Sequence, residues 1–361
     1  MHIALAFNLK GDSPVVAISD ETPAAKDDLY AEWDDIHTIE AVKSALARKH
    51  RVSLVEADLD AFETLRKLKP DLVFNMTEGL LGASREAQIP AILDMLGLAY
   101  TGSDPVTLGI CLDKRRTKEI LAYHDIATPR FVTVTSVDQI PSRLRYPQMV
   151  KPILEGSSKG VPDASLVHDR RALVRQVRKV LEIYRQPALI EEFLPGREFT
   201  VAVLGNEAQL RILPVVEINF DALPEGVNPI YSYEAKWIWD REEEPLQIFT
   251  CPALLDASLQ AGIENLCRRA FTVLGCRDWC RIDVRLDGRG APHIIELNPL
   301  PGILPRPEQN SCFPKAARAA GLSYDDLILA VVDAAAIRLN LREGRQHESS
   351  CLFQSRSVSA G

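Results

Sequence analysis

The sequence lacks the segments that would place it in a membrane or mark it for export. In its 361 residues, no apolar run approaches the roughly 20 that a membrane-spanning helix needs. Residues 1–7 are apolar, but they lack the basic flank and the cleavage site of a signal peptide, so they are expected to form a first strand. We therefore expect a cytoplasmic protein without a membrane partner.

Zinc-binding patterns, excess positive charge and repeats are also missing. The seven cysteines are scattered, without a Cys-x-x-Cys pair or a His/Cys cluster of zinc spacing, which favours reduced thiols. The net charge is −8, from 42 Lys and Arg against 50 Asp and Glu, which argues against a nucleic-acid partner. No internal repeat and no Walker A phosphate loop occurs. Hydrophobic residues make up 46% and charged residues 25%, as in ordinary globular proteins, and the length suits two or three domains.

Residues 1–103 alternate short apolar strands with amphipathic helices. Strands are predicted at 2–7, 52–55 and 71–75, with apolar side chains three or four positions apart in the helices between them. Asp34 or Asp35 is expected to cap the first helix. This alternation predicts right-handed crossovers and a mostly parallel, Rossmann-like sheet, with ligands beyond the carboxyl ends of its strands.

The rest of the chain predicts two units of mixed structure. Helices are expected near 113–123 and 169–184, with strands at 131–134, 148–151 and 188–192. Two hairpins (199–204 with 210–218, and 279–286 with 292–298) and helices at 256–273 and 323–339 follow. The fold class is therefore predicted to be α/β and α+β. The expected domains are 1–103, 104–194 and 195–340, with residues 341–361 as a polar, flexible tail.

The segment Gly156-Ser157-Ser158-Lys159-Gly160 has two interpretations beyond an ordinary surface loop. It matches Gly-x-Ser-x-Gly, the nucleophile elbow of hydrolases, which needs a strand directly before it and a helix after it. Here the strand ends too early, and Val161-Pro162 stands where a helix should begin. The alternative is a flexible loop whose backbone N–H groups and hydroxyls wrap phosphate oxygens, aided by the charges of Lys151 and Lys159.

The strongest constellation joins Arg281-Ile282-Asp283 to Glu296-Leu297-Asn298. Alternate residues of a strand share a face, and a hairpin turn centred on Arg289-Gly290 would place Asp283 opposite Glu296. Two carboxylates, one amide oxygen and one guanidinium predict a Mg²⁺ site that substrate phosphates complete. The alternative is a lattice of cross-strand salt bridges, although unpaired charge among these apolar neighbours would be costly. Residues 299–303 form a Pro/Gly turn that could present a backbone N–H to a developing oxyanion.

A further pair of carboxylates, Glu191-Glu192, follows an apolar strand and precedes Glu198. Consecutive carboxylates often form a solvated face. The functional alternative is a nucleotide edge, where the backbone reads an adenine and Glu198 accepts hydrogen bonds from ribose hydroxyls.

Taken together, these segments resemble the D-alanine–D-alanine ligase family of the ATP-grasp superfamily. The resemblance covers residues 71–340 and rests on ordered motifs: Tyr100-Thr101-Gly102-Ser103, Leu112-Asp113-Lys114-Arg115-Arg116-Thr117-Lys118, Val150-Lys151-Pro152 with Glu155-Gly156-Ser157-Ser158, Gly196-x-Glu198-Phe199-Thr200-Val201, Tyr233-Glu234-Ala235-Lys236, Arg281-x-Asp283-Val284, Glu296-x-Asn298 and Pro301-Gly302. It implies an ATP-grasp fold with an N-terminal parallel α/β domain, a central α+β domain and a C-terminal ATP-grasp domain, and ATP between the last two.

The resemblance also implies a role for each matched position. ATP phosphates would be held by Lys114 and Lys151, beneath a loop that carries Ser157 and Ser158. Adenine would be held by Glu191 and the backbone through Glu192, Phe193 and Leu194, and ribose by Glu198. Lys236 would reach the γ-phosphate. Two Mg²⁺ ions, or Mn²⁺ as an alternative, would be bound by Asp283, Glu296 and Asn298. The tetrahedral intermediate would be stabilised by Arg281 and the N–H of Gly302.

The chain departs from the family pattern where substrates bind. The family's glutamate for the first ammonium has no clean match after the first strand, and Glu32, Asp34 or Asp35 would substitute for it. Other departures are Glu78 in place of a His-Gly motif, Trp237 in place of a tyrosine, and Pro307, beside Arg306, near the place of the acceptor serine.

We therefore predict an ATP-dependent carboxylate–amine ligase that forms an amide bond through an acyl phosphate, with other amino acids or a peptide as substrates. The expected partners are small molecules, with a homodimer as one candidate assembly. The alternatives are a genuine D-alanine–D-alanine ligase of cell-wall synthesis, a non-catalytic ATP-binding protein, and a carboxylase-type enzyme that forms carboxyphosphate from bicarbonate.

Overall fold

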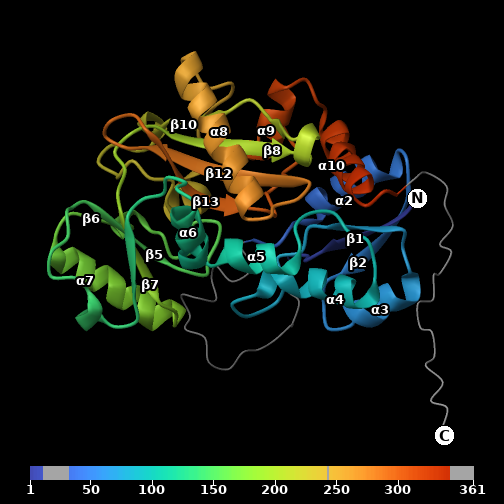
Figure 1. Cartoon of the computed structure of the whole chain (residues 1–361), viewed down its shortest axis with the longest axis horizontal. Coiled ribbons are helices and arrows are strands. Elements are labelled where there is room, and N and C mark those ends of the chain that lie inside the picture. Colours follow the sequence, from blue (N-terminus) through green and yellow to red (C-terminus); the bar gives the residue numbers. More distant parts are fainter. Residues whose placement is uncertain (11–31, 242–243, 342–361) are drawn as a thin grey trace, which may run out of the picture.

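A computed structural model describes residues 1–10, 32–241 and 244–341 (Figure 1). The described residues form three sheets. In Figure 1 the N-terminal sheet and the central sheet lie at opposite ends of the molecule, and the C-terminal sheet lies above them. The predicted tail lies outside the described residues apart from Leu341. Among the described helices, none combines the length and apolarity that a membrane crossing requires.

The N-terminal sheet is parallel, as predicted, in the order β2-β1-β3. Its strands are β1 (His2–Phe7), β2 (Arg51–Glu56) and β3 (Leu72–Asn75). Alternate residues of β1 enter two cores. Ile3 and Leu5 face α2 (Ile36–Ala47), and Ala4 and Ala6 face α3 (Ala61–Leu68) and α4 (Gln88–Leu96). A parallel sheet covered on both faces explains why β1 is apolar at nearly every position.

The core on the α2 side is completed by the far end of the chain. Helices α9 (Cys312–Ala319) and α10 (Tyr324–Arg338) bring Phe313, Leu327 and Val331 into the same cluster as Ile39 and Leu5. Figure 1 shows α10 (red) beside α2 (blue). The N-terminal sheet is therefore anchored on the C-terminal part, which fixes its carboxyl edge relative to the rest of the molecule. The boundaries expected after residues 103, 194 and 340 remain predictions.

The central sheet is antiparallel, in the order β4-β7-β5-β6. Its strands are β4 (Phe131–Val134), β7 (Ala188–Glu192), β5 (Gln148–Pro152) and β6 (Leu166–Val167). Helix α7 (Arg170–Lys179), extended by a π-helical turn to Tyr184, packs its apolar stripe on this sheet. Two helices, α5 (Pro105–Leu112) and α6 (Lys114–Tyr123), connect it to the N-terminal part.

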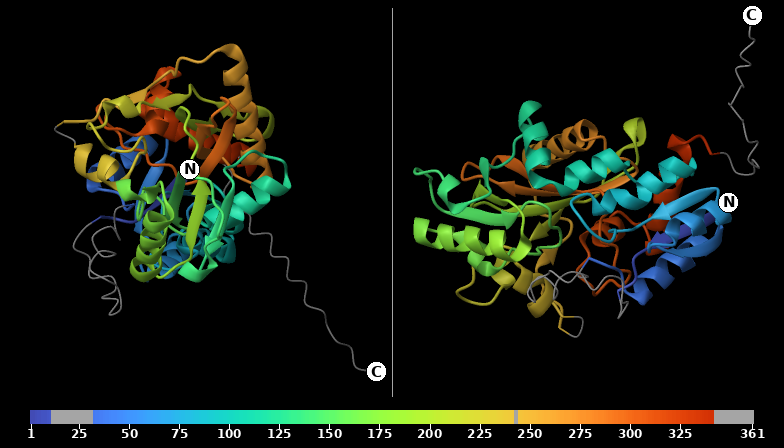
Figure 2. Two further views of the ribbon diagram at one scale, coloured as in Figure 1. Left: turned by 90° about the vertical axis from the view of Figure 1, so that its left-hand side faces the viewer. Right: turned by 90° about the horizontal axis from the view of Figure 1, so that it is seen from below.

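The C-terminal sheet runs in the order β11-β10-β8-β12-β13. These are β11 (Phe249–Thr250), β10 (Val216–Ile218), β8 (Glu198–Leu204), β12 (Trp279–Leu286) and β13 (Pro292–Asn298), with β9 (Arg211–Ile212) also paired to β8. Helix α8 (Ala257–Val273) covers one face. The strand expected at 210–218 is divided into β9 and β10, because Pro214 between them has no N–H to donate. Figure 2 shows this sheet and the central sheet from two further sides.

Candidate active site

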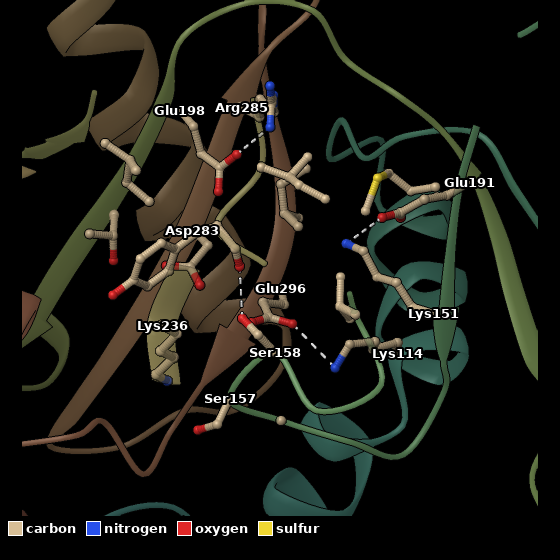
Figure 3. Close-up of a pocket in the computed structure, with 18 of the residues that line it drawn as sticks. Lys114, Lys151, Ser157, Ser158, Glu191, Glu198, Lys236, Asp283, Arg285 and Glu296 are labelled. Atoms are coloured by element: carbon tan, nitrogen blue, oxygen red, sulfur yellow. Dashed lines mark hydrogen bonds and ion pairs between the residues drawn. The ribbon is translucent and has the colours of Figure 1, made fainter. Parts of the chain in front are cut away.

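One pocket lies between the central and C-terminal sheets, and it gathers most of the predicted site residues (Figure 3). Thirteen of them line it: Lys114, Lys151, Ser157, Ser158, Glu191, Glu192, Phe193, Leu194, Glu198, Lys236, Arg281, Asp283 and Glu296. Asn298, Gly302, Glu78, Trp237 and Arg306 are not among the lining residues. Side chains that are far apart in the sequence thus face one cavity.

The β12–β13 hairpin has the predicted register at its functional end. Asp283 is opposite Glu296, and Arg281 is opposite Asn298. The turn, however, is centred on Arg289 rather than between Arg289 and Gly290 as predicted, because Leu286 pairs with Pro292. A β-bulge adds one residue to β13 between these pairs, which restores the expected pairing of the carboxylates.

Cations already hold the two carboxylates of this hairpin. Arg281 lies 3.0 Å from Asp283 and 3.7 Å from Glu296, and Lys114 lies 3.2 Å from Glu296. Burial raises the pKa of Asp283 more than Arg281 lowers it. For Glu296, burial is outweighed by Lys114, Arg281 and Lys151, which lower its pKa to about 2. The lattice of salt bridges considered from the sequence is therefore present.

The same hairpin fits a magnesium ion by the chemistry of its donors. Within the described ranges, no group of three or more His, Cys, Asp and Glu side chains forms a ready metal cage. Two carboxylates, Asp283 and Glu296, and the Asn298 amide oxygen lie on one end of the hairpin. That amide oxygen accepts a hydrogen bond from the N–H of Leu300 at 3.1 Å and keeps a second lone pair. A few hard oxygen ligands beside a cavity suit Mg²⁺, which takes its other ligands from water and phosphate.

The opposite wall of the pocket is built on a buried carboxylate between two lysines. Glu191 on β7 is 2.6 Å from Lys151 on β5 and 2.8 Å from Lys118 on α6. Although burial alone raises its pKa, the two ammonium groups lower it to about 2. Lys118 is fully buried, and its Nζ also donates to Thr128 at 2.8 Å. The sequence reasoning gave Lys118 no role, although it follows Lys114 by four residues and so lies on the same helix face.

The glycine- and serine-rich segment is a tight turn at the mouth of the pocket. The N–H of Lys159 donates to the carbonyl of Gly156 at 2.9 Å, and both central residues have positive φ, 51° at Ser157 and 61° at Ser158. This is a type I′ geometry that favours Asn or Gly, and serine there costs about 1–3 kcal/mol per residue. The hydroxyl of Ser158 donates to the Tyr231 carbonyl at 2.9 Å, and the Trp237 indole N–H donates to the Ser157 carbonyl at 3.0 Å. These contacts hold the strained turn in place.

The hydrolase interpretation of this segment does not survive. Strand β5 ends at Pro152, well before the turn, and a 3₁₀ turn at Asp163–Ser165 follows instead of a helix. A nucleophile elbow requires strand, sharp turn and helix in direct succession.

Charged pairs also connect this turn to the N-terminal part. Lys159 lies 2.7 Å from Glu32 and 3.0 Å from Glu155, and Arg85 lies 3.1 Å from Glu32. Burial raises the pKa of Glu32, but Lys159 and Arg85 outweigh it and lower the pKa to about 2. Glu32, which the sequence offered as a substitute for an ammonium-binding glutamate, is therefore already neutralised by two cations.

Three other acidic residues of the N-terminal part have pKa values that are raised rather than lowered. Burial and the neighbouring Glu32 raise the pKa of Glu78 well above its usual range and that of Glu86 to about 7. Burial and the neighbouring Asp35 raise the pKa of Asp34 to about 8. Asp35 itself caps α2, since its carboxylate accepts the N–H of Thr38 at 2.7 Å. This region therefore carries more carboxylates than cations.

The remaining predicted positions surround the pocket. Lys236 lines it, and burial and then Arg281 lower the pKa of its amine to about 8. That amine lies 5.2 Å from the ring centre of Trp237. Gly302 is exposed just after β13, and Arg306 is exposed further along the same loop.

Sequence reasoning missed one pocket residue of note, Arg285. Its guanidinium lies 2.5 Å from Glu198 and 4.4 Å from the ring centre of Phe193. The signal was available, because Arg285 follows Asp283 by two residues on a strand and so shares its face.

These sheets, with an acidic hairpin, paired lysines and a serine turn around one cavity, define the class as an ATP-grasp ligase. The fold is that of the D-alanine–D-alanine ligase of Bacillus anthracis, solved in complex with ATP, with a TM-score of 0.66, 22% identity, and coverage of 94% of this chain and 98% of that one.

Sequence comparison gives the family. A family model for the D-ala D-ala ligase C-terminus matches residues 119–333. The chain is 34% identical to the uncharacterized protein y4sG of Sinorhizobium fredii over 312 residues, 84% of this chain and 88% of that protein. It is also 34% identical to the D-alanine–D-alanine ligase of Bordetella petrii over 273 residues, 75% of this chain and 77% of that enzyme. The chain therefore belongs to the D-alanine–D-alanine ligase family and is an ATP-dependent ligase of that type.

Proposed function

We propose that this enzyme joins the carboxylate of one amino acid or peptide to the amine of another through an acyl phosphate. A carboxylate is a poor electrophile because its negative charge resists attack. Transfer of the γ-phosphoryl group of ATP to a carboxylate oxygen releases ADP and gives the acyl carbon a good leaving group. The amine then attacks that carbon, loses a proton and expels inorganic phosphate. Positioning and charge neutralisation supply most of the catalysis of such a phosphoryl transfer.

The observation that carries the proposal is the convergence of three kinds of group on one pocket. Lysine ammonium groups at Lys114 and Lys151 lie on one side, and the carboxylates of Asp283 and Glu296 on the other. The turn of Ser157 and Ser158 lies beside both. Cations for phosphate oxygens, oxygen ligands for a divalent metal and a loop that covers the phosphates are the parts that phosphoryl transfer needs.

Asp283, Glu296 and Asn298 would hold two Mg²⁺ ions, or Mn²⁺ as the alternative. Bound there, the metal would neutralise charge on the phosphate oxygens. The Lys114 ammonium lies 3.2 Å from Glu296 and also donates to the Glu155 carbonyl, so it would be a cation for a phosphate oxygen beside the metal-binding carboxylates. Lys236 would reach the γ-phosphate. Arg281 and the Gly302 N–H would face the oxyanion of the tetrahedral intermediate, where one donor is worth about 3–4 kcal/mol in comparable sites.

The nucleotide would lie with its base against the carboxyl end of β7. The backbone from Glu192 to Leu194 would read the adenine, with Glu191 behind it, and Glu198 would accept hydrogen bonds from the ribose. The two substrates would then lie toward the N-terminal part, which adjoins the pocket where Lys159 meets Glu32.

The substrate side supports a departure from two D-alanines. Glu32 is neutralised by Lys159 and Arg85, so Glu78 and Asp34 are the candidates for the ammonium of the donor. Arg306 would offer a guanidinium fork to the acceptor carboxylate. The Trp237 indole N–H donates to the Ser157 carbonyl. A substrate that contacts Trp237 would therefore affect the position of the Ser157-Ser158 turn. A genuine D-alanine–D-alanine ligase is the second candidate, because several relatives carry that name.

A screen of amino-acid and dipeptide pairs tests the proposal. ADP release is followed with MgATP, and the mass of each product is measured. We expect ATP turnover that depends on both a carboxylate donor and an amine acceptor, with D-alanine dimerisation slow or absent. Efficient D-alanyl-D-alanine synthesis would favour the second candidate, and turnover that depends on bicarbonate alone would favour a carboxylase.

A further inference from the structure

Arg285 is a buried guanidinium that none of the proposed catalytic steps uses. It lies on β12 with 5% of its surface exposed, and its strand register places it directly opposite Glu198 on β8. Its Nη1 is 2.5 Å from a Glu198 oxygen, and its Nη2 donates to the Pro229 carbonyl at 2.9 Å. Figure 3 shows this pair at the end of the pocket away from Ser157, Ser158 and Lys114, so it does not face the phosphate side.

The guanidinium also lies over two aromatic rings. Its central carbon lies 4.4 Å from the ring centre of Phe193 and 5.1 Å from that of Phe220. Phe193 belongs to the segment proposed to read the base, and Glu198 is the residue proposed to bind the ribose. Arg285 is therefore in contact with both halves of the proposed nucleoside site.

Stability alone does not account for an arginine at this position. Its Nε–H is buried and has no hydrogen-bond acceptor among the described residues. An unfilled buried donor is unfavourable, and well-packed apolar residues commonly replace buried ion pairs without loss of stability. Val284 and Leu286, its neighbours on β12, are both buried and apolar. A polar group bound in the pocket would account for an arginine at this position.

We propose that Arg285 is a positioning residue that sets the enzyme's preference for a ribonucleotide. The stack on Phe193 and the bond to Pro229 fix the guanidinium, and its single contact with one Glu198 oxygen fixes the plane of that carboxylate. A carboxylate has about four acceptor positions, so this contact leaves several for the vicinal 2′- and 3′-hydroxyls of a ribose. Without the guanidinium, the Glu198 side chain is free to rotate and the hydroxyls lose a preset acceptor. The inference rests on the proposed nucleotide site.

Direct nucleotide binding tests this without knowledge of the two substrates. Dissociation constants for ADP, 2′-deoxyADP and 3′-deoxyADP are measured calorimetrically with Mg²⁺ for the wild type, Arg285→Met and Arg285→Lys. Arg289→Met, in the exposed turn of the same hairpin, is the matched control. Hydrogen bonds to charged groups predict that the wild type binds ADP about tenfold more tightly than either deoxynucleotide. We expect Arg285→Met to reduce that ratio to about threefold or less, Arg285→Lys to restore part of it, and Arg289→Met to leave it unchanged.

Glu198→Ala supplies the second measurement and covers the case in which Arg285→Met fails to fold. If Arg285 acts through Glu198, Glu198→Ala abolishes the preference by itself, and adding Arg285→Lys to it changes the ratio no further. A preference that survives in Arg285→Met or Arg285→Lys at its wild-type value would overturn the inference, as would a wild type that binds all three nucleotides equally. Failure of the wild type to bind ADP at all would instead refute the proposed nucleotide site.

Discussion

Two pairs of buried carboxylates differ in how their charge is balanced: Glu191 and Glu296 in the pocket, here called the nucleotide side, and Asp34 and Glu86 in the N-terminal part, here called the N-terminal side. On the nucleotide side, Glu191 and Glu296 each lie within about 3 Å of a lysine, and both have pKa values of about 2. On the N-terminal side, burial and neighbouring carboxylates raise the pKa of Asp34 to about 8 and of Glu86 to about 7. The first set of charges is balanced by the protein itself. The second has a surplus of acid, which suits the ammonium group of a substrate.

The largest expected effect is the loss of turnover when a carboxylate is removed from the nucleotide side, where lysines balance the carboxylates. Glu296→Gln keeps the shape of the side chain but removes a metal ligand. Turnover is expected to fall by about 100-fold or more, since even the hydrogen-bond partners of metal ligands are worth about 10- to 100-fold. Steady-state ADP release measures the loss, and thermal unfolding checks the fold. Glu182→Gln, an exposed site on the central part, is the control. A variant that remains active and is merely less stable would reduce Glu296 to a salt-bridge partner.

Removal of a cation from the same side is expected to have the next largest effect. Ligand binding to the native state stabilises it by RT ln(1 + [L]/Kd), about 2.7 kcal/mol at a hundredfold excess over Kd. MgATP should therefore raise the melting temperature of the wild type, and Lys151→Ala should blunt that rise. Lys179→Ala, exposed on α7, should behave as the wild type. The absence of a shift at saturating MgATP in the wild type would refute nucleotide binding.

The substrate side is expected to respond in KM rather than in turnover. Arg306→Ala removes the proposed partner of the acceptor carboxylate, so the acceptor KM should rise far more than the ATP KM. An arginine offers a planar fork of donors to a carboxylate, so its loss should weaken binding of the acceptor and leave the nucleotide contacts in place. Full kinetics with the best substrate pair from the screen give both constants. Equal changes in the two would place Arg306 outside the acceptor site.

The arrangement of residues on the nucleotide side was predicted from the sequence better than that on the N-terminal side. Asp283, Glu296 and Arg281 lie on two strands joined by a short turn, so the period of two sufficed to pair them. The turn itself is centred half a residue from its predicted place, and the bulge compensates for that shift, so the carboxylates are paired as predicted. Lys151 and Glu198 were singled out from their own segments of the sequence, whereas the role of Lys114 came from the resemblance to the ligase family.

The N-terminal side resisted prediction because its contacts are distant in the sequence. Glu32 meets Arg85 and Lys159 only once two parts of the chain are folded together, and no spacing rule links those positions. The shared core of α2 and α10 is hidden for the same reason, since each helix alone shows only an apolar stripe. Arg285 differs, because its face was predictable but its partner Phe193 was not.

The most direct probe of the acidic surplus is the pH dependence of stability at Asp34. Its pKa in the folded protein is raised to about 8, above its ordinary value, mainly by burial and then by Asp35. Between about pH 4 and pH 8 the unfolded chain has therefore lost the proton that the folded protein keeps, and stability falls as pH rises through that range. Asp34→Asn cannot lose this proton. Its free energy of unfolding should exceed that of the wild type by an amount that grows from pH 5 to pH 8 and then levels off.

Urea unfolding of the two proteins at pH 5, 6, 7 and 8 measures that difference, and other titrating groups cancel between them. Asp138→Asn, an exposed site on the central part, should give a difference that does not change with pH. Parallel pH profiles for the wild type and Asp34→Asn would mean that Asp34 is already ionised in the folded protein. The N-terminal side would then lack the excess of protonated acid that distinguishes it from the nucleotide side. A widening gap would instead mark Asp34 as a carboxylate that the fold leaves without a cation, and an ammonium group of the donor could supply that cation.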